Sequence, residues 1–421
     1  MKLTKITEFK DNKNLTCNNN IITYEPKYIY IPLFDNNEKY EVMVNIGDNI
    51  KIGQIIAISK NHKIPYHSSI SGLVTDVNKK MYINSGLNVP CVEIKNDYKN
   101  ESIIEKNDFT YNKESIINSI KENGIVGMGG AGFPTFLKYK DKNINNLIIN
   151  GCECEPFITC DYRLMYEQTI KLINGIHYVL KAINGKNAYI CIKEQYTDLY
   201  NLLNQYVDEE IKIVQVPNKY PVGYERYLVE LITKKKYDKI PSEVDSIVNN
   251  VSTIIAIHDA VKYNSPLITR VVTITGYCLD RQLNIKLKIG TNIEEILENI
   301  CMIKHKYHNK HLIAGGPMTG KCINGSNLIV TKTLNSVIIN PYLRKQNEIN
   351  ECLGCGKCAN ICPMKLTPTE IIKQLNKKDK NELKKLKAQN CIKCGLCSYI
   401  CPSRIDLTLQ TSKACDIIRR G

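Results

Sequence analysis

The residues most able to carry chemistry in this 421-residue chain are cysteines near its C-terminus. Two runs, CLGCGKCANICP (352–363) and CIKCGLCSYICP (391–402), share the spacing C-x2-C-x2-C-x3-C-P. Clustered cysteines in a reducing compartment usually bind metal or take part in redox chemistry, because disulfides do not persist there. This spacing is the bacterial pattern for two 4Fe–4S clusters, in which three close thiolates wrap one cluster and the fourth binds the other.

The predicted ligands therefore form two crossed groups of four. Cys352, Cys355, Cys358 and Cys401 make up the first group, and Cys391, Cys394, Cys397 and Cys362 make up the second. A pair of zinc sites is the alternative, since zinc also binds four thiolates. Zinc ribbons typically place two C-x2-C knuckles far apart, so this spacing favours iron–sulfur.

The segment between the two cysteine runs is predicted to be helical. Thr367–Glu370 matches a capping box with proline at the first helical position, and Ile371, Ile372 and Leu375 follow at helical spacing. The two runs are thus separated by helix, as in α-helical ferredoxins. The segment also carries Lys377, Lys378, Lys380, Lys384, Lys385 and Lys387. These lysines could form a docking face for an acidic electron carrier, but a solvated helix face is the favoured interpretation.

A second feature with possible chemistry is the glycine loop GMGGAGFPT (127–135). Gly127, Gly129 and Gly132 spell the dinucleotide fingerprint G-x-G-x-x-G, which must follow a strand and open a helix. Here a helical pattern precedes the loop and the apolar strand at 147–149 follows it. The order argues against a Rossmann turn, although such a glycine-rich backbone can still lie close against phosphate or a flavin ring.

The elements around this loop follow an α/β pattern from about residue 114 to 262. Apolar strands at 147–149, 188–192 and 211–216 alternate with helical segments, which predicts a parallel sheet covered on both faces. Ligands of such sheets bind beyond the carboxyl ends of the strands. The residues expected there are Asn150–Glu155, Lys193–Glu194 and Tyr220–Glu225.

The remaining parts of the chain complete a multidomain α/β architecture. Short β-like runs broken by glycines at 41–77 resemble the barrel-sandwich module of lipoyl and biotinyl carriers, but neither Lys60 nor Lys63 has the context of the modified lysine. A small α+β unit runs from the strand at 270–276 to the turn AGGPMTG (314–320). We expect a barrel-sandwich hybrid domain at 1–110, a Rossmann-like α/β domain binding flavin and nucleotide at 111–265, a β-grasp-like domain at 266–345, and a ferredoxin-type domain at 346–421.

Composition narrows the class of protein. Hydrophobic residues make up 43% and charged residues 24% of the chain, as in ordinary globular proteins, and the formal charge is +15. Much of that charge comes from a composition rich in Lys, Asn and Ile along the whole chain. The sequence contains no recognisable nucleic-acid-binding module. No apolar stretch approaches the ~20 residues of a membrane helix. The prediction is a cytoplasmic protein that reaches a membrane only through partner subunits.

Several segments occur in one order that resembles a known family. They are GMGGAGFPTFLKYK, INGCECEPFITCDYRLM, YPVGYERYLVE, VNNVSTIIAI and HLIAGGPMTG, followed by the two cysteine runs. Together they resemble the RnfC family, a component of the Rnf ion-translocating electron transport complex, over nearly the whole chain. The GGAGFPT loop is also similar to that of the NADH-binding flavoprotein subunit of respiratory complex I.

The resemblance implies two further cofactors, FMN and NAD(H), and assigns residues to them. The residues it places at these cofactors are Gly127, Gly129, Gly130, Lys138, Asn150, Glu153, Glu155, Tyr220, Gly223, Glu225, Asn249, Asn250 and Thr253. Within this set Lys138 and Asn150 would meet FMN, Glu153 and Glu155 would lie near NADH, and Asn249, Asn250 and Thr253 would form the FMN phosphate turn. The chain departs from the family pattern at Tyr224, where a glycine is usual, and at Cys152, which adds a thiol near the flavin.

The implied activity is that of an ion-translocating ferredoxin:NAD+ oxidoreductase subunit. Electrons would pass between NAD(H) and other Rnf membrane and ferredoxin-like subunits at the cytoplasmic face of the membrane, through FMN and two 4Fe–4S clusters, coupled to Na+ or H+ transport. One alternative is a soluble NADH-dependent electron-transfer protein serving a cytosolic reductase. Another is a non-catalytic iron–sulfur relay scaffold. Tyr224 is the only residue that favours this alternative.

Two smaller groups of possible ligands remain. Cys152, Cys154 and Cys160 have no standard cluster spacing and are predicted to be buried, inert thiols. His305, His308 and His311 lie at H-x2-H-x2-H spacing within a basic segment that lacks acidic or thiol ligands nearby, so a basic loop is favoured over a metal site.

Overall fold

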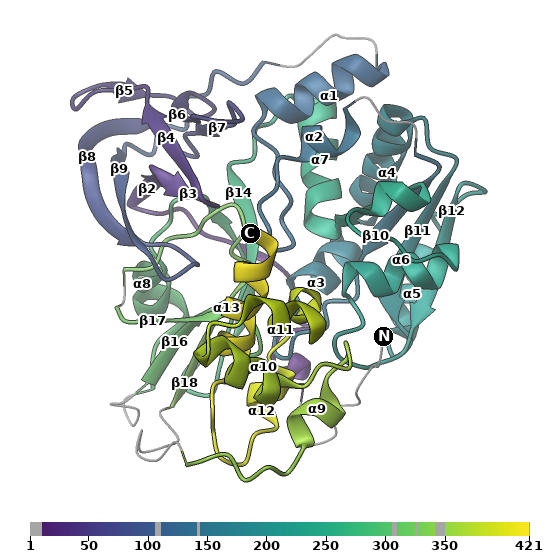
Figure 1. The fold of residues 1–421 in the computed structure, drawn as a ribbon. Coiled ribbons are helices and arrows are strands. Elements are labelled where there is room, and N and C mark those ends of the chain that lie inside the picture. The colour runs from purple at the N-terminus through teal and green to yellow at the C-terminus, as the bar shows by residue number, and fades with distance from the viewer. Residues whose placement is uncertain are drawn as a thin grey trace.

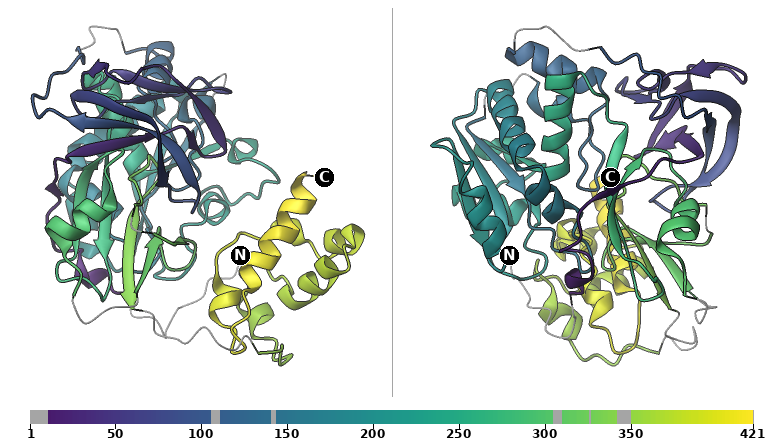
Figure 2. Two further views of the ribbon diagram at one scale, coloured as in Figure 1. Left: turned by 90° about the vertical axis from the view of Figure 1, so that its left-hand side faces the viewer. Right: turned by 180° about the vertical axis from the view of Figure 1, so that it is seen from behind.

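The structure is a computed structural model that describes residues 11–105, 111–140, 144–304, 310–325, 327–341 and 350–420. It contains four regions: N-terminal strands in purple and blue, a parallel sheet with its helices in teal, a mixed sheet in green, and helices in yellow-green and yellow at the C-terminus (Figure 1). Seen from the side, the C-terminal helices form a lobe beside the other three regions (Figure 2). The predicted boundaries after residues 110 and 345 fall at or within segments outside the described residues.

Two four-stranded antiparallel sheets form the N-terminal region. One is ordered β2 (Tyr28–Pro32), β9 (Asn88–Asn96), β8 (Gly72–Tyr82) and β5 (Asn49–Ile50). The other is ordered β3 (Phe34–Asp35), β4 (Glu38–Val42), β6 (Ile55–Ser59) and β7 (Pro65–His67). Ile29, Ile31, Ile56 and Tyr66 are fully buried between them, as expected for β-branched and aromatic residues in facing sheets.

A four-stranded parallel sheet follows in the order β12-β11-β10-β13. Its strands are β10 (Asn146–Asn150), β11 (Asn187–Lys193), β12 (Ile211–Val216) and β13 (Ser246–Asn250). The first three match the predicted strands, whereas β13 was not predicted because SIVNN runs directly into an apolar helix. The register pairs Asn150 with Cys191 on one side and with Asn250 on the other, so the carboxyl ends of these strands are level.

Seven helices accompany this sheet. They are α1 (Lys113–Glu122), α2 (Thr135–Tyr139), α3 (Cys160–Glu167), α4 (Thr169–Ile183), α5 (Thr197–Leu203), α6 (Glu225–Thr233) and α7 (Val251–Tyr263). Asn112 starts α1 by accepting a hydrogen bond from the Ser115 amide, as N-cap asparagines do. Helices α4 and α7 cross closely, because a Cβ at Gly175 would lie only 2.5 Å from the Ile254 carbonyl oxygen.

The third region is a six-stranded mixed sheet in the order β1-β15-β14-β18-β16-β17. Its strands are β1 (Ile22–Thr23), β14 (Thr269–Thr275), β15 (Leu283–Lys288), β16 (Lys310–Ala314), β17 (Lys321–Ile323) and β18 (Ser336–Pro341). The helix α8 (Ile293–Ile296) and a π-helical turn (Leu297–Cys301) complete this α+β unit. Strand β1 joins from the N-terminal segment, a pairing that local sequence patterns do not reveal.

The regular elements of the C-terminal region, within its described residues 350–420, are all helices joined by loops. Its helices are α9 (Lys357–Ile361), α10 (Pro368–Asn376), α11 (Lys380–Lys385), α12 (Leu396–Tyr399) and α13 (Leu407–Arg420). Helix α10 begins at Pro368 as predicted, but the capping box is wrong. Thr367 makes no side-chain cap, and Glu370 accepts a hydrogen bond from Gln374 instead of binding back to the Thr367 amide.

Candidate functional site

The glycine loop lies between α1 and α2 and precedes β10 (Figure 1). The Gly127 amide donates to the Phe133 carbonyl at 2.8 Å, and the Gly132 amide donates to the Gly127 carbonyl at 3.1 Å. These bonds close the loop on itself. Because no strand leads into it, the prediction that this is not a Rossmann turn is confirmed.

The loop rests on the carboxyl end of β13. A Cβ at Gly129 would lie 3.3 Å from the Asn250 Cβ, and the Met128 amide donates to Thr253 Oγ1 at 2.9 Å. The buried Arg270 side chain donates to the Met128 carbonyl at 2.8 Å. In this strand order the direction of winding reverses between β10 and β13, which is where ligands bind in open α/β sheets.

Gly130 gives the loop an open surface. Its φ is +116°, and a Cβ built there would meet no atom within 4 Å. A glycine in this conformation, with free space above it, lets a flat ligand approach the backbone closely.

A cleft of about 560 Å³ opens over Gly129 and Gly130. This volume lies within the roughly 300–1,000 Å³ typical of small-molecule sites. Glu155 also lines the cleft, and it accepts hydrogen bonds from the Met318 amide at 2.9 Å and the Thr319 hydroxyl at 2.5 Å. Burial raises the pKa of the Glu155 carboxyl, while these hydrogen bonds oppose the rise.

The loop that contains Tyr220 and Gly223 sits on the end of β10. Asn150 donates from Nδ2 to the Gly223 carbonyl at 2.8 Å and accepts from the Cys152 amide at 3.2 Å. A Cβ at Gly223 would lie 3.2 Å from Asn150 Oδ1 and 3.3 Å from the Cys152 Cβ. The structure thus brings Asn150 and Gly223 into contact, although β11 lies between the strands that precede them, β10 and β12.

Two predicted FMN residues lie at the carboxyl end of β13. The Asn249 Oδ1 is buried and has no hydrogen-bond partner among the described residues. Lys138 donates to the Val248 carbonyl at 3.0 Å, and burial lowers its pKa while the Glu225 charge opposes that effect. An unpaired acceptor and an ammonium group near one strand end fit a flavin mononucleotide, which brings hydroxyl donors and an anionic phosphate.

Two of the predicted site residues accept hydrogen bonds from backbone amides at the starts of helices. The Glu153 carboxylate accepts from the Asp161 and Tyr162 amides, at 2.8 and 3.3 Å, at the start of α3. Asn250 caps α7 and donates to Asp161 at 2.6 Å. Neither residue is among those that line the cleft in the described part of the chain.

The second cysteine group is assembled across the two motifs. The pKa of the Cys394 thiol is raised to about 12, mainly by burial and in part by the charges of Cys397, Cys362 and Cys391. The pKa of the Cys397 thiol is raised to about 11, chiefly by burial and in part by the charges of Cys391 and Cys362. Cys362 is therefore close enough to three cysteines of the second motif to influence their charges, while the crossed ligand set itself remains a prediction.

The first cysteine group is more open. Cys352 and Cys355 are exposed, and Cys358 feels the charge of Cys352. Helix α9, which carries Cys358, packs against α12, which directly precedes the fourth predicted ligand, Cys401. The membership of Cys355 and Cys401 in this group remains a prediction.

The spacing of the thiols argues against zinc. A tetrahedral site with Zn–S bonds of about 2.3 Å needs sulfur atoms about 3.8 Å apart. Within the described ranges, no three cysteine sulfur atoms lie within 4.8 Å of one another. The described cysteines therefore do not form a preformed tetrahedral zinc site.

The second cysteine motif docks directly on the cleft region. The Tyr220 hydroxyl donates to the Cys394 carbonyl at 2.7 Å. The next residue, Gly395, packs so tightly on the mixed sheet's turn that a Cβ there would lie 2.4 Å from the Met318 carbonyl oxygen. Since the Met318 amide binds Glu155 in the cleft wall, only a few residues separate the cleft from this cysteine group.

Residues that depart from the family pattern lie around this contact. Tyr224 precedes α6 and is not among the cleft-lining residues of the described chain. The charges of Arg226 and Arg419 act on its side chain. Cys152 and Cys160 are buried, and burial raises the pKa of both thiols far above its usual range, so they are inert as predicted. Cys154 is half-buried.

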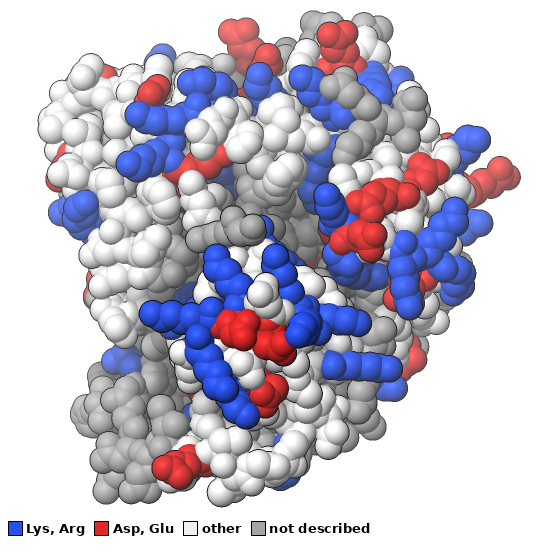
Figure 3. Space-filling view, viewed as in Figure 1, with Lys and Arg blue, Asp and Glu red and all other residues white. Residues whose placement is uncertain are grey.

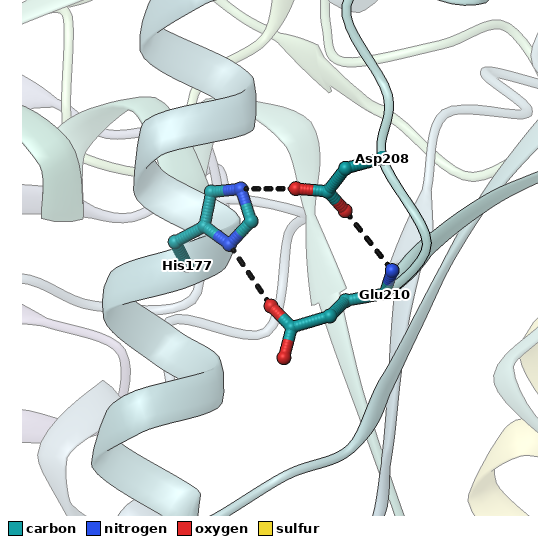
Figure 4. Close-up of side chains that lie close together, drawn as sticks. All are labelled: His177, Asp208 and Glu210. Atoms are coloured by element: carbon teal, nitrogen blue, oxygen red, sulfur yellow. Dashed lines mark hydrogen bonds and ion pairs between the residues drawn. The ribbon is translucent and has the colours of Figure 1, made fainter.

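Histidine groups offer little for metal binding. His305 and His308 lie outside the described residues, and His311 Nδ1 lies 3.6 Å from Cys322 Sγ. His177 contacts Asp208 at 3.1 Å through Nε2 and Glu210 at 3.4 Å through Nδ1 (Figure 4). Because the two carboxylates bind opposite ring nitrogens, this exposed group ties α4 to the start of β12 and does not converge on one ion.

The surface of the C-terminal helices is strongly basic. Lys and Arg side chains crowd this face and surround a few acidic groups (Figure 3). Some of the lysines form ion pairs along the helix surface, such as Lys385 with Glu382 at 2.6 Å. Along the described chain, we find no helix both long enough and apolar enough to cross a membrane.

Comparison with protein families divides the chain into three matched segments. Residues 5–99 match the RnfC barrel sandwich hybrid domain, residues 120–259 the Nuo51 FMN-binding domain, and residues 351–405 a 4Fe-4S dicluster domain. The chain therefore carries an FMN-binding domain and a 4Fe–4S domain. Its fold also matches an NAD+-reducing [NiFe]-hydrogenase in the H2-reduced state, with a TM-score of 0.52 and 16% identity over 73% of this chain and 61% of that one.

Curated relatives agree with these matches over most of the length. The chain is 31% identical to the RnfC subunit of the proton-translocating ferredoxin:NAD(+) oxidoreductase complex of Clostridium ljungdahlii, covering 88% of this chain and 83% of the relative. It is 32% identical to the RnfC subunit of the ion-translocating oxidoreductase complex of Rhodobacter capsulatus, covering 86% and 72%. Against the corresponding protein of Vibrio cholerae it is 32% identical, over 82% of this chain but 46% of the relative. The chain belongs to the RnfC family of ion-translocating oxidoreductase complexes.

Proposed function

We propose that this protein is the peripheral NADH- and FMN-dependent electron-transfer subunit of an Rnf complex. It exchanges electrons between NAD(H) and the membrane subunits, as part of a ferredoxin:NAD+ oxidoreductase that moves Na+ or H+. The observation that carries the proposal is the contact between the Tyr220–Gly223 loop, which packs on the end of β10, and the second cysteine motif, through the Tyr220 hydroxyl and the Cys394 carbonyl. A nucleotide-binding loop and a redox centre packed this closely form a continuous path.

The chain would hold FMN between the glycine loop and the ends of β10 and β13. Gly127, Gly129 and Gly130 form its bed, and Lys138 and Asn249 supply the charge and acceptor at the end of β13. A bound flavin would supply the conversion of a two-electron hydride transfer from NADH into single-electron transfers, which iron–sulfur clusters alone cannot perform. The protein side chains position the reactants and exclude water.

Two 4Fe–4S clusters would occupy the two cysteine groups. The group of Cys362, Cys391, Cys394 and Cys397 contacts the cleft loops, so it is the inner centre. The group of Cys352, Cys355, Cys358 and Cys401 has two exposed cysteines and is the outer centre. Electrons leaving the protein would therefore depart from the outer group.

Partner subunits would dock on the C-terminal lobe and hold the protein at the cytoplasmic face of the membrane. The basic face of this lobe suits an acidic ferredoxin-like subunit, because complementary charge speeds and orients association (Figure 3). We also propose the four domains at 1–110, 111–265, 266–345 and 346–421 as the functional division of the chain.

The test is anaerobic purification followed by analysis of flavin, iron and NADH oxidation. We expect one FMN, about eight iron atoms per chain, and bleaching of the flavin and cluster absorbance by NADH. A protein with iron but without flavin or bleaching would be a relay scaffold. Full activity with a cytosolic reductase and no association with membrane subunits would support the soluble alternative.

A further inference from the structure

The cleft above the glycine loop is built by three regions of the chain, and the N-terminal barrel-sandwich module supplies one whole wall. From this module the cleft is lined by Phe34, Asp35, Asn36, Asn37, Asn84, Ser85 and Leu87. The mixed sheet supplies another part of the lining, which includes Gly315, Gly316 and Lys321, and Lys321 lies next to the barrel at Gly86. A module related to carrier domains but lacking their lysine thus has a place in the site.

The tip of the β3–β4 hairpin is held rigidly at this wall. Asn36 and Asn37 form its two-residue turn, with φ of +49° and +63°. The buried Asp35 carboxylate accepts from the Asn36 amide at 2.9 Å and from the Tyr66 hydroxyl at 2.6 Å. Asparagine tolerates positive φ values better than most residues. A turn with two such residues also matches the right-handed twist of the strands that it joins.

A buried lysine fixes this hairpin to the other two regions. The Lys332 ammonium lies 4.3 Å from the centre of the Tyr66 ring. It donates to the Pro65 carbonyl of the barrel at 2.7 Å and to the Gly124 carbonyl before the glycine loop at 2.8 Å. Three regions therefore meet at one side chain, so the position of the hairpin tip relative to the loop is set by the fold.

The tip also explains one glycine of the G-x-G-x-x-G pattern. A Cβ at Gly132 would lie only 2.2 Å from the Asn36 side chain. Gly132 is thus needed where the barrel hairpin packs on the loop, whereas Gly130 faces open space. The hairpin tip and the loop form one continuous surface along the cleft.

The polar groups available on the described lining include a cation and an amide, with the Ser85 hydroxyl beside them. Lys321 is exposed and forms no ion pair with any described residue. The exposed Asn37 side chain makes no hydrogen bond within the described ranges. The carboxylates of the lining, Asp35 and Glu155, are both occupied by hydrogen bonds.

We propose that Asn37 and Lys321 bind the ribose and pyrophosphate part of NAD(H), with the barrel-sandwich module acting as a fixed wall of the dinucleotide site. This inference rests on the proposed function, in which NAD(H) exchanges electrons with FMN bound on the glycine loop. An ammonium attracts the two phosphate charges, and an amide can bind ribose hydroxyls. The wall then selects the dinucleotide, while the glycine loop and the end of β13 retain the flavin.

The test measures the Kd of NADH for the FMN- and cluster-loaded protein in the Lys321→Glu and Asn37→Asp variants. Each adds repulsion to the pyrophosphate, so we expect about tenfold weaker binding, relieved in part by high salt, with unchanged flavin content and dithionite-reduced spectrum. Lys310→Glu, on the neighbouring strand β16, and Asn61→Asp, in the exposed β6–β7 turn, carry the same charge changes outside the cleft and should bind NADH like the wild type.

Equal NADH affinity in each variant and its control would overturn the inference. If the wild type binds NADH without bleaching, the proposed electron transfer fails, yet the variants still decide whether this wall binds the dinucleotide. If the wild type does not bind NADH at all, both proposals are wrong.

Discussion

The cysteine lobe and the cleft region of this protein are specified in opposite ways. The ligands of each cysteine group come from two short motifs, and the crossed position of Cys362 follows from one proline-terminated spacing. The cleft is assembled from a barrel hairpin, a glycine loop, a strand end and a sheet turn that are far apart in sequence. The comparison teaches that the redox centres depend on local spacing, whereas the nucleotide site depends on how whole regions pack.

The largest expected effect tests the crossed ligand set. Cys362→Ser should remove the inner cluster, because a hydroxyl replaces one of its four thiolates, and iron should fall from about eight to about four atoms per chain. Cys415→Ser is the control, since the Cys415 thiol lies 3.7 Å from the Cys391 carbonyl but is not a predicted ligand. Loss of iron in Cys415→Ser and not in Cys362→Ser would break the crossed assignment. Iron analysis and electron paramagnetic resonance of the reduced protein decide between them.

The next effect tests whether the cleft depends on the open face of the glycine loop. Gly130→Val should weaken FMN binding by about tenfold or more, because the side chain fills the bed on which the flavin lies. Gly47→Val is a matched control, since Gly47 also has positive φ, +92°, and no atom within 4 Å of a built Cβ. Both variants carry the same backbone strain, so a difference in flavin content isolates occupation of the bed. Equal flavin retention in the two variants would contradict a flavin at Gly130.

A third prediction concerns acid sensitivity of the barrel wall. His67 is buried in β7, its Nδ1 lacks a partner among the described residues, and burial lowers its pKa from 6.5 to about 3. The unfolded chain takes up this proton near pH 6.5 and the folded chain does not, so stability is present above pH 6.5 and is lost as the pH falls toward 3.

Hydrogen exchange of the barrel amides, corrected for intrinsic rates, measures this loss. Protection should fall between pH 7 and pH 5 in the wild type and fall less in His67→Gln. His177→Gln, on α4 outside the barrel, should leave the barrel profile like that of the wild type. Identical pH profiles for all three proteins would show that His67 does not set the acid limit of this wall.

The smallest effect tests the contact between the cleft region and the cysteine lobe. Tyr220→Phe removes the hydrogen bond to the Cys394 carbonyl, which is worth about 0.5–1.5 kcal/mol. Cluster reduction after flavin reduction should slow about two- to tenfold in stopped-flow traces, with flavin reduction itself unchanged. Tyr24→Phe, which removes a hydroxyl bound to Glu295 far from this contact, is the control. An equal rate of cluster reduction in both variants would mean that this bond does not hold the lobe in place.

The same contrast explains which features the sequence predicted. The 4Fe–4S domain, the strands β10 to β12 and the helix–loop–strand order at Gly127 rest on local patterns, and these predictions are confirmed. Strand β13 was missed because its polar end, Asn249–Asn250, and the apolar helix after it leave no turn signal between them.

Other features could not be predicted because they depend on tertiary contacts. The role of Gly132 comes from Asn36, almost a hundred residues earlier in the chain. The positions of Glu153 and Asn250 follow from α3 and α7, which they cap, and no motif distinguishes a helix-capping carboxylate from one that faces a ligand. The closure of Tyr220 on Cys394 likewise spans 174 residues.

Strand β1 has a consequence for the order in which the protein is made. It pairs with β15, and the adjoining Asn19 side chain donates to the Gln282 carbonyl across 263 residues at 3.0 Å. A ribosome must therefore release most of the polypeptide before its opening segment can find its place, and such distant pairings slow folding. Protease digestion of stalled nascent chains should find this segment cleavable until β15 has emerged. Early protection of it would show that another contact holds it first.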